Sequence, residues 1–370
     1  MRILLLGEYS NVHATLAEGL RELGHEVVVV SDGDYIYHYK TDIPLCREGK
    51  GKWSAIKYVT KLLRLLPKLR GFDIVQLVNP DFLSLKAERQ LPVYRYLRHN
   101  NRRVVLGAFG NDWQWVHSGL HERLFRYGDF YIGDTPRENA YARMLAKEWI
   151  GTMKGELSQM VAKDCDAIVP CLYEYDKCYR QVYPEKTHFI PLPVKTPTTK
   201  NTCERETHLP IKFFIGIKRH MMDYKGTDIM LEALNIMKEK YPDRCEVSIA
   251  EDLPFEQYME MMNGNDVILD QLYSYTPAMN ALQAMAMGLV CMGGGEPENY
   301  EILHEKDLKP IINIQPSLDD TCRALEQLIM NPHQLSELKR QSIQYVERHH
   351  HYLKVAHQYA DLYQHLLKDK

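Results

Sequence analysis

Short apolar runs rich in β-branched residues alternate with helical patterns through the first half of the chain. These runs occupy residues 2–6, 26–30, 73–78, 103–109, 166–170 and 188–192. Nearly continuous apolar strands separated by helices predict a parallel sheet that helices cover on both faces. Between the first two runs, apolar residues recur at helical spacing from Val12 to Leu23, and Gly24 can end that helix. The chain is therefore expected to begin with a β-α-β unit.

The alternation is interrupted once and then restarts. Residues 195–210 lack apolar periodicity and contain the helix-breaking residues Pro197 and Pro210, which indicates a linker. Five further strand-like runs follow, at 211–217, 245–250, 266–270, 289–293 and 310–314. From Ser317 onward the pattern is helical to the end.

The chain length also favours two domains, because 370 residues exceed the ~250 at which single cores stop growing. We predict an α/β fold with two Rossmann-like domains, each a doubly wound parallel sheet, over residues 1–196 and 207–351. Open sheets of this kind bind ligands at the carboxyl ends of their strands. The functional site is therefore expected at a cleft that both domains face.

Composition excludes several classes of protein. The chain is 45% hydrophobic and 26% charged with a formal net charge of -3, so neither disorder nor nucleic-acid binding is expected. The first apolar run stops at Gly7 and Glu8, too early for a secretory signal, and no run approaches the ~18 apolar residues of a membrane span. The eight cysteines include no C-x-x-C pair, so we expect reduced thiols, no zinc site and a cytoplasmic location.

The first candidate site is the turn after the first strand. Gly7 joins that strand to the first helix, whose amides and dipole can receive an anion. The turn has no G-x-G-x-x-G pattern, and the chain has no G-x-x-x-x-G-K-[ST] loop. A plain strand-to-helix turn is the equally weighted alternative.

A basic turn follows the strand at 211–217. Lys218, Arg219 and Lys225 lie between that strand and a helix predicted over 229–238, with Thr227 as its N-cap. A guanidinium that grips phosphate oxygens, an ammonium and a helix N-terminus together suit a diphosphate. The alternative is a solvated basic loop.

A second turn follows the strand at 266–270. Thr276 as N-cap and Pro277 at the first helical position predict a helix whose first-turn amides, those of Met279 and Asn280, form another anion site. Asn280 and Gln283 are three residues apart, so both side chains can meet one ligand. A polar helix face without a ligand is the alternative.

These segments, in this order, resemble the donor-binding half of glycosyltransferase family 4, a retaining family with the GT-B fold. The matching elements are Arg219 with Lys225-Gly226, the run 283–288, Gly294 with Glu298, and Gly110-Asn111-Asp112. The resemblance covers most of the chain. It implies an N-terminal acceptor-binding domain, a C-terminal donor-binding domain, and a C-terminal helix over 352–370 that crosses back to the first domain.

The sequence departs from the family at two acidic positions. The two glutamates of the family motif fall on Tyr275 and Gln283, and its turn glycine falls on Ala278. In the family these glutamates bind hydroxyls of the donor sugar and ribose. Gln283 keeps an acceptor oxygen but loses the charge that strengthens a hydrogen bond. Two interpretations of this departure are open: the donor sugar is unusual, or the site is catalytically inactive.

The resemblance further implies a metal-independent, hexosyltransferase-like enzyme of polysaccharide biosynthesis that needs no cofactor. Its substrates would be a nucleotide-diphosphate sugar and a glycan or lipid-linked acceptor. Arg219, Lys225 and the amides of Met279 and Asn280 would stabilise the departing nucleoside diphosphate. Asp112 is the candidate for orienting the acceptor or stabilising the oxocarbenium ion, with a helix cap as the alternative. The D-x-D triplets at 32–34 and 164–166 lack the remaining features of a GT-A metal site.

A basic stretch over residues 50–70 carries seven Lys and Arg residues and no acid, interleaved with Trp53 and several aliphatic residues. Such a stretch can lie on anionic lipid and bring a lipid-linked acceptor to the enzyme. A surface helix with a solvated basic face is the alternative. Two other functions also stay open: a degenerate nucleotide-sugar-binding protein, and a GT-B sugar-nucleotide epimerase, which shares a Gly-rich element like 293–296.

Overall fold

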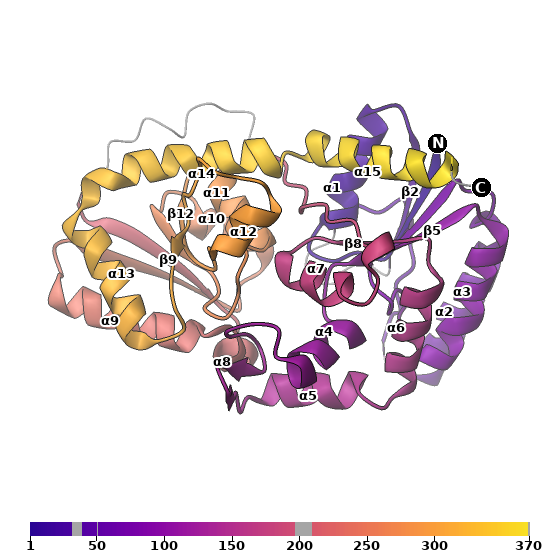
Figure 1. Ribbon diagram of the computed structural model, residues 1–370, viewed down its shortest axis with the longest axis horizontal. Helices are drawn as coiled ribbons and strands as arrows, with labels where there is room; N and C mark the ends of the chain where they lie inside the picture. Colours follow the sequence, from indigo (N-terminus) through magenta and orange to yellow (C-terminus); the bar gives the residue numbers. More distant parts are fainter. Residues whose placement is uncertain (32–38, 50, 197–208, 369–370) are drawn as a thin grey trace. The chain divides into compact units, whose positions relative to one another are not determined.

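The structure is a computed structural model that describes residues 1–31, 39–49, 51–196 and 209–368. Its contacts divide the chain into two compact units (Figure 1). Unit 1 comprises Met1–Glu122, Leu145–Pro193 and Tyr352–Lys370, and unit 2 comprises Arg123–Met144 and Val194–His351. The triplet 32–34, Lys50 and most of the predicted linker lie outside the described residues.

Unit 1 is built on a six-stranded sheet in the order β3-β2-β1-β4-β5-β8, and every pairing in it is parallel. Its strands are β1 (Arg2–Leu6), β2 (Glu26–Ser31), β3 (Ile43–Pro44), β4 (Ile74–Leu77), β5 (Arg103–Ala108) and β8 (Ala167–Pro170). The strand order reverses between β1 and β4, because β2 follows on one side of β1 and β4 on the other. This order is that of a doubly wound Rossmann-like domain, as predicted.

The predicted strand at 188–192 is absent. An isolated parallel bridge joins Thr187 to Ile168, and the amides of His188 and Ile190 donate to the carbonyls of Ile168 and Pro170 at 2.9 and 3.2 Å, but the described segment forms no strand. Pro191 and Pro193 lack the N–H groups that a strand would need to continue the ladder.

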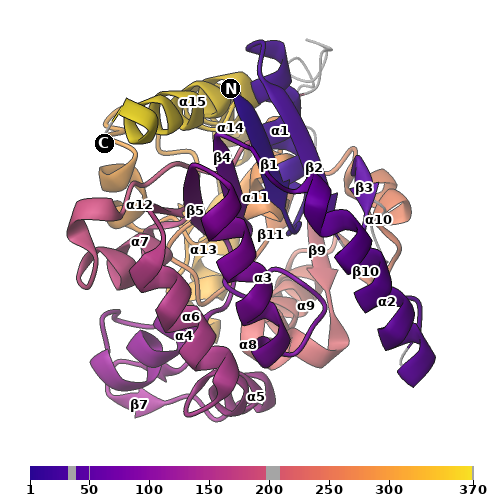
Figure 2. The same cartoon turned by 90° about the vertical axis from the view of Figure 1, so that its right-hand side faces the viewer.

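Helices cover both faces of the unit 1 sheet. They are α1 (Val12–Glu22), α2 (Lys52–Leu65), α3 (Ala87–Asn100), α4 (Trp113–His117), the C-terminal half of α5 (Ala140–Trp149), α6 (Met153–Asp164), α7 (Tyr173–Arg180) and α15 (Tyr352–Lys368). The C-terminal helix α15 packs on α1 (Figure 2), where a β-carbon on Gly19 would lie 2.7 Å from Cβ of Ala356. Tyr363 of α15 also donates a 2.5 Å hydrogen bond to Gln76 of β4. The chain therefore returns to unit 1 at its end, as predicted.

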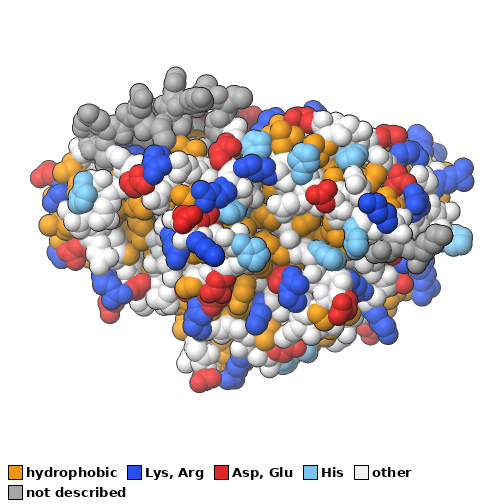
Figure 3. All heavy atoms as spheres, turned by 45° about the horizontal axis from the view of Figure 1, so that its top comes forward, with side chains coloured by type: hydrophobic (Ala, Val, Ile, Leu, Met, Phe, Trp, Pro, Cys, Tyr) orange, Lys and Arg blue, Asp and Glu red, His pale blue; other side chains and the backbone are white. Residues whose placement is uncertain are grey.

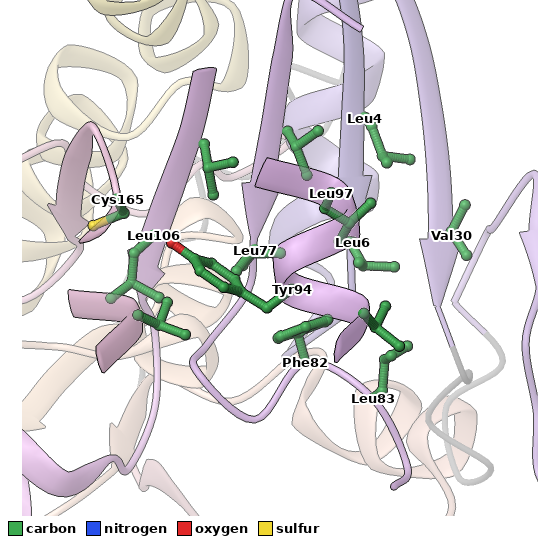
Figure 4. Packing of buried hydrophobic residues seen from close by; sticks show 14 of the residues in the cluster. Leu4, Leu6, Val30, Leu77, Phe82, Leu83, Tyr94, Leu97, Leu106 and Cys165 are labelled. Carbon is green, nitrogen blue, oxygen red and sulfur yellow. The ribbon is translucent and has the colours of Figure 1, made fainter. Parts of the chain in front are cut away.

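Alternate residues of the central strands supply two separate apolar layers. Leu4 and Leu6 of β1 lie with Leu77 and Leu106 of the neighbouring strands, against Tyr94 and Leu97 of α3 (Figure 4). Ile3 and Leu5 point to the other face, toward α1 and α15. Because both faces are covered, each strand reads as a continuous apolar run.

Unit 2 holds a second parallel sheet, in the order β10-β9-β11-β12-β13. Its strands are β9 (Ile211–Ile217), β10 (Cys245–Glu251), β11 (Val267–Leu269), β12 (Val290–Gly293) and β13 (Ile312–Asn313). Its helices are α8 (Met222–Lys225), α9 (Thr227–Lys240), α10 (Phe255–Met262), α11 (Met279–Ala286), α12 (Pro297–Ile302), α13 (Leu318–Met330), α14 (Leu335–His349) and the start of α5. The strand order reverses between β9 and β11, so this unit too is Rossmann-like.

Residues Arg123–Met144 belong to unit 2 by their contacts, although they lie within the range 1–196 predicted for the first domain. They include a small antiparallel pair, β6 (Tyr131–Ile132) with β7 (Thr135–Pro136), which lies outside both parallel sheets.

The charged side chains are interspersed on the face that Figure 3 shows, where acidic and basic groups alternate over short distances. Among the described residues, no helix is long and apolar enough to cross a membrane.

Candidate functional site

The carboxyl ends of β9 and β11 are adjacent in unit 2, because the two strands pair directly. Lys218 and Arg219 follow β9, and Asp270 follows β11. The strand order reverses between these two strands, which is where open α/β sheets bind their ligands. We call residues 218–226 the basic turn and residues 270–278 the second turn.

Arg219 is the most exposed cation of the basic turn. Its side chain is 73% exposed, and its guanidinium pairs with Glu251 at the end of β10. That hydrogen bond raises the pKa of Arg219 and lowers the pKa of Glu251. The guanidinium is therefore charged and lies at the solvent edge of the sheet.

Gly226 fixes how the basic turn enters α9. Its φ of 73° lies in the left-handed region, and a β-carbon there would lie 2.6 Å from Cβ of Leu272. Gly226 is also the N-cap, so α9 begins at Thr227. The predicted N-cap at Thr227 is wrong by one residue, because a left-handed glycine at the turn lets Thr227 adopt helical geometry.

Lys225 joins the two turns. Its carbonyl accepts a 2.9 Å hydrogen bond from the amide of Leu272 in the second turn. Burial raises the pKa of Asp270, and the nearby Lys225 ammonium opposes that rise. The Lys225 charge thus lies close to the carboxyl end of β11.

Helix α11 begins two residues later than predicted. Ala278 is its N-cap and Met279 its first residue, so the predicted cap at Thr276 is wrong. Thr276 instead stays in the loop, where its amide donates to the Ser274 hydroxyl at 3.3 Å. The amide of Glu296 also donates to the Tyr275 carbonyl at 3.1 Å, which ties this bend of the loop to the segment after β12.

The first turn of α11 faces polar partners. Asn280 donates to Asp270 at 3.1 Å and accepts from the Tyr258 hydroxyl at 2.9 Å. Gln283 lies one turn further along α11 and is half-buried. The amides of Met279 and Asn280 lie in the first turn, where a helix supplies no backbone acceptor.

Tyr275 and Glu298 are held by residues that the sequence analysis did not single out. The Tyr275 side chain is 2% exposed, and its hydroxyl accepts a 2.7 Å hydrogen bond from the amide of Arg126. Both carboxylate oxygens of Glu298 accept from the Arg126 guanidinium, which lowers the pKa of Glu298. Neither Arg126 nor its neighbours carry a recognisable motif, so no sequence signal could have found them.

Glu296 is the other acidic residue that Arg126 contacts, and the sequence predicts no role for it in the donor site. It is buried, and its carboxylate accepts hydrogen bonds from Arg126 at 2.7 Å, Tyr127 at 2.6 Å and Gln315 at 2.7 Å. Burial tends to raise its pKa, but these donors and Asn313 lower it overall. Its place directly after Gly293–Gly295 is the one sequence signal that pointed toward it.

Gly7 lies in unit 1, at the end of β1. Its φ is 89°, and a β-carbon there would lie 2.3 Å from Val78, so the position requires glycine. The Glu8 carboxylate accepts from the amides of His13 at 3.2 Å and Ala14 at 2.8 Å in the first turn of α1. The chain itself thus supplies a carboxyl group to this helix N-terminus.

Asp112 also lies in unit 1, where it is fully buried. It caps α4 by accepting from the amide of Trp115 at 2.8 Å, and it accepts from the Tyr179 hydroxyl at 2.6 Å. Burial raises its pKa to about 6. These contacts match the helix-cap alternative, and the catalytic role stays a prediction.

The fold can be compared with known proteins. No model of a protein family matches the sequence, and no curated protein matches it. Sucrose-phosphate synthase from Thermosynechococcus elongatus has a similar structure, with a TM-score of 0.62, 12% identity and full coverage of both chains. HepE of Anabaena in complex with UDP and glucose also gives a TM-score of 0.62, with 9% identity and coverage of 99% of this chain and 100% of its own.

A third similar structure is that of WaaG, a glycosyltransferase involved in lipopolysaccharide biosynthesis. It has a TM-score of 0.54 and 14% identity, and the match covers 98% of this chain and 99% of WaaG. At these identities the likeness establishes the fold alone. The chain has the GT-B fold that the sequence analysis predicts.

Proposed function

We propose that this protein is a retaining glycosyltransferase that moves a sugar from a nucleotide-diphosphate sugar to a glycan or lipid-linked acceptor. One observation carries the proposal: the basic turn and the second turn meet at the carboxyl ends of β9 and β11 in a GT-B fold. HepE, one of the similar structures, is in complex with UDP and glucose. A nucleotide sugar is accordingly the donor class that we assign to unit 2.

The chemistry of the proposed reaction is the departure of a nucleoside diphosphate, which gains negative charge as the bond to the sugar breaks. Arg219 and Lys225 supply positive charge at the basic turn, and the amides of Met279 and Asn280 supply oriented donors. Preorganised groups of this kind stabilise developing charge without a metal ion. The protein's own cations would serve in place of a metal, so the proposal includes metal independence.

Thermal stabilisation by UDP-, GDP- and dTDP-sugars tests the donor site. A ligand that binds only the folded state at 100 times its Kd raises the free energy of unfolding by about 2.7 kcal/mol. We expect one nucleotide series to raise Tm and Lys225→Met to reduce that rise. Lys240→Met is the matched control, because Lys240 of the same unit pairs with Glu326 on α13. A Tm that no nucleotide changes would contradict the proposal.

Assays of the bound donor separate the two alternative functions. Tight donor binding with neither transfer nor hydrolysis would identify a degenerate binding protein, in line with the loss of carboxylates at positions 275 and 283. Donor turnover without any acceptor would identify an epimerase. Transfer to an added acceptor with the anomeric configuration retained, read by NMR of the product, is the expected result.

We also propose that α2 of unit 1 contacts an anionic membrane surface, where a lipid-linked acceptor for polysaccharide biosynthesis would reside. Three large apolar side chains on this helix are exposed: Trp53 by 78%, Ile56 by 54% and Leu63 by 60%. Five basic residues on and just beyond α2 are exposed beside them: Lys52, Lys57, Lys61, Arg64 and Lys68. Apolar groups and cations on one helix face suit the interface of an anionic bilayer.

Co-sedimentation with vesicles tests the membrane contact. Vesicles with anionic phosphatidylglycerol should pull down the protein, and neutral phosphatidylcholine vesicles should not. Reversal of charge at Lys57, Lys61 and Arg64 should abolish binding, since each cation near the surface contributes about 1 kcal/mol. Equal binding by the reversed variant would leave α2 as a surface helix with a solvated basic face.

A further inference from the structure

Residues 123–144, which we call the strap, come from the first half of the sequence but contact both turns of the proposed donor site in unit 2. The strap leaves unit 1 after Glu122 and returns to it at Leu145. Two of its arginines, Arg126 and Arg137, make polar contacts to the turns and to the residues beside them. They are therefore the residues through which the strap can act on the site.

Arg137 holds the basic turn. Its guanidinium donates to the carbonyl of Asp223 at 2.6 Å and of Tyr224 at 3.2 Å, both just before Lys225. The same group lies over the ring of Tyr273 in the second turn, with Cζ 3.2 Å from the ring centroid. It also donates to Gly128 of the strap itself at 2.9 Å. One guanidinium thus connects the strap with both turns.

A second contact reinforces this end of the strap. The Tyr224 hydroxyl donates to the carboxylate of Asp129, and the ring of Tyr224 packs against Tyr141 with centroids 4.4 Å apart. The carbonyls that Arg137 binds belong to α8, whose last residue is Lys225. The strap therefore holds the backbone of the helix that carries Lys225.

Arg126 holds the other side of the site. Its guanidinium makes a two-point contact with Glu298 and a further bond to Glu296, while its amide donates to the Tyr275 hydroxyl. The Tyr127 ring packs against that of Tyr275 at 4.8 Å. Tyr275 stands where family 4 enzymes carry a glutamate. The strap therefore lies on the side of the turn that the resemblance to this family assigns to the donor sugar.

We propose that the strap positions the donor site in two separable parts: Arg137 sets the diphosphate-binding turn, and Arg126 sets the sugar-binding side. Both are positioning residues, because they act through Lys225 and through Tyr275 with Glu298. This inference rests on the proposed function. It adds that the affinity for the nucleotide and the affinity for the sugar depend on different arginines.

Calorimetry tests whether the two arginines have separate roles. The probes are UDP, GDP and dTDP and the glucose conjugate of each. Arg137→Ala should weaken the binding of the bare nucleotide and of its sugar conjugate by the same factor, about tenfold. A factor of about ten is the effect of one lost charge-assisted hydrogen bond. Arg126→Ala should leave the affinity for the bare nucleotide unchanged and lower the affinity for the sugar conjugate by about tenfold. Arg143→Ala is the matched control, because Arg143 lies in the strap and its side chain pairs, within the described part of the chain, with Glu138 at 4.0 Å rather than with either turn.

The unliganded Tm of each variant separates positioning from general loss of structure. If Arg137→Ala does not fold, Arg137→Lys replaces it, because an ammonium keeps the charge but loses the planar two-point geometry. Affinities within twofold of the wild type in folded Arg126 and Arg137 variants would overturn the proposal. If Arg126→Ala lowered the affinities for the nucleotide and for its sugar conjugate equally, the division into two parts would be overturned.

Hydrogen exchange keeps the inference testable even if the wild type binds none of the six probes, in which case the proposed function fails. Without ligand, Arg137→Ala should speed amide exchange at 222–226 and 272–275 by at least about tenfold, as expected when the contacts that suppress local opening are lost. Arg143→Ala should not. Unchanged exchange in Arg137→Ala would show that the strap does not position these turns.

Discussion

Gly226 lies directly against the side chain of Leu272, so that the turn after β9 meets the turn after β11 with no room for a side chain of its own. A β-carbon on Gly226 would lie 2.6 Å from Cβ of Leu272, and the Leu272 amide donates to the neighbouring Lys225 carbonyl at 2.9 Å. Gly226 also has a left-handed φ of 73°. This close approach sets the distance between the two turns of the proposed donor site.

Gly226→Ala should therefore destabilise the protein by about 2 to 3 kcal/mol, since it adds steric overlap to backbone strain. Urea unfolding would measure the loss, and the affinity for the nucleotide should fall with it. Gly24→Ala is the control, because Gly24 has a similar φ of 81° but nothing within 4 Å. Equal losses in the two variants would mean that the contact with Leu272 does not contribute.

Glu8 should make the stability of the protein fall as pH rises through neutrality. Burial raises its pKa to about 7 against an ordinary 4.5, despite hydrogen bonds from Ala14 and His13. A raised pKa favours the folded state below the unfolded pKa, and this contribution is lost as pH rises through the folded value. The difference between the two pKa values corresponds to about 3 kcal/mol.

The variant Glu8→Gln removes this titration. Its free energy of unfolding should improve relative to the wild type between pH 5 and pH 8, as urea unfolding at both values would measure. Glu88→Gln on α3 is the control, because Glu88 is exposed. A wild-type difference between the two pH values that Glu8→Gln preserves would contradict this assignment.

Glu305 should make the stability of the protein fall as pH decreases, the opposite of the effect of Glu8. Burial alone would raise its pKa, but the amide of Leu308, the side chains of His349 and Arg348, and the amide of Asp307 bring it down to about 2. A lowered pKa stabilises the folded state above the unfolded value of 4.5, and the contribution is lost as pH falls toward 2.

Glu305→Gln should cost about 3 kcal/mol at pH 7, the usual loss when one partner of a buried ion pair is removed. The difference from the wild type should shrink as pH falls from 4.5 toward 2. Thermal unfolding across this range measures it. A difference that is independent of pH would show that the charge of Glu305 is not responsible.

Asp112 offers a direct choice between its two interpretations. As the cap of α4 and the acceptor of the Tyr179 hydroxyl, it should contribute about 1 to 3 kcal/mol, so Asp112→Ala should lower Tm. Asp112→Asn keeps an acceptor oxygen and should retain most of the stability. If Asp112→Asn also keeps kcat, the cap accounts for the residue. A folded Asp112→Asn enzyme without turnover would support the acceptor role.

The sequence predicted the sheets well because their signals are local. Apolar runs such as 2–6 and 211–217 must be continuous where helices cover both faces of a strand, and the structure confirms these strands. Local signals failed where a neighbouring contact decided the outcome. The segment at 188–192 lost its strand to two prolines, and α11 begins at Met279 because loop contacts hold Thr276 outside the helix.

What the sequence determined by itself is the pair of Rossmann-like units, the basic turn and the position of the second turn, since each depends on residues that are close along the chain. Only the tertiary structure decided which groups Tyr275 and Glu298 contact. Arg126 lies 149 residues from Tyr275 and 172 from Glu298. No periodicity or spacing relates positions so far apart, because their contact exists only after the sheet of unit 2 has formed and the strap has packed against it.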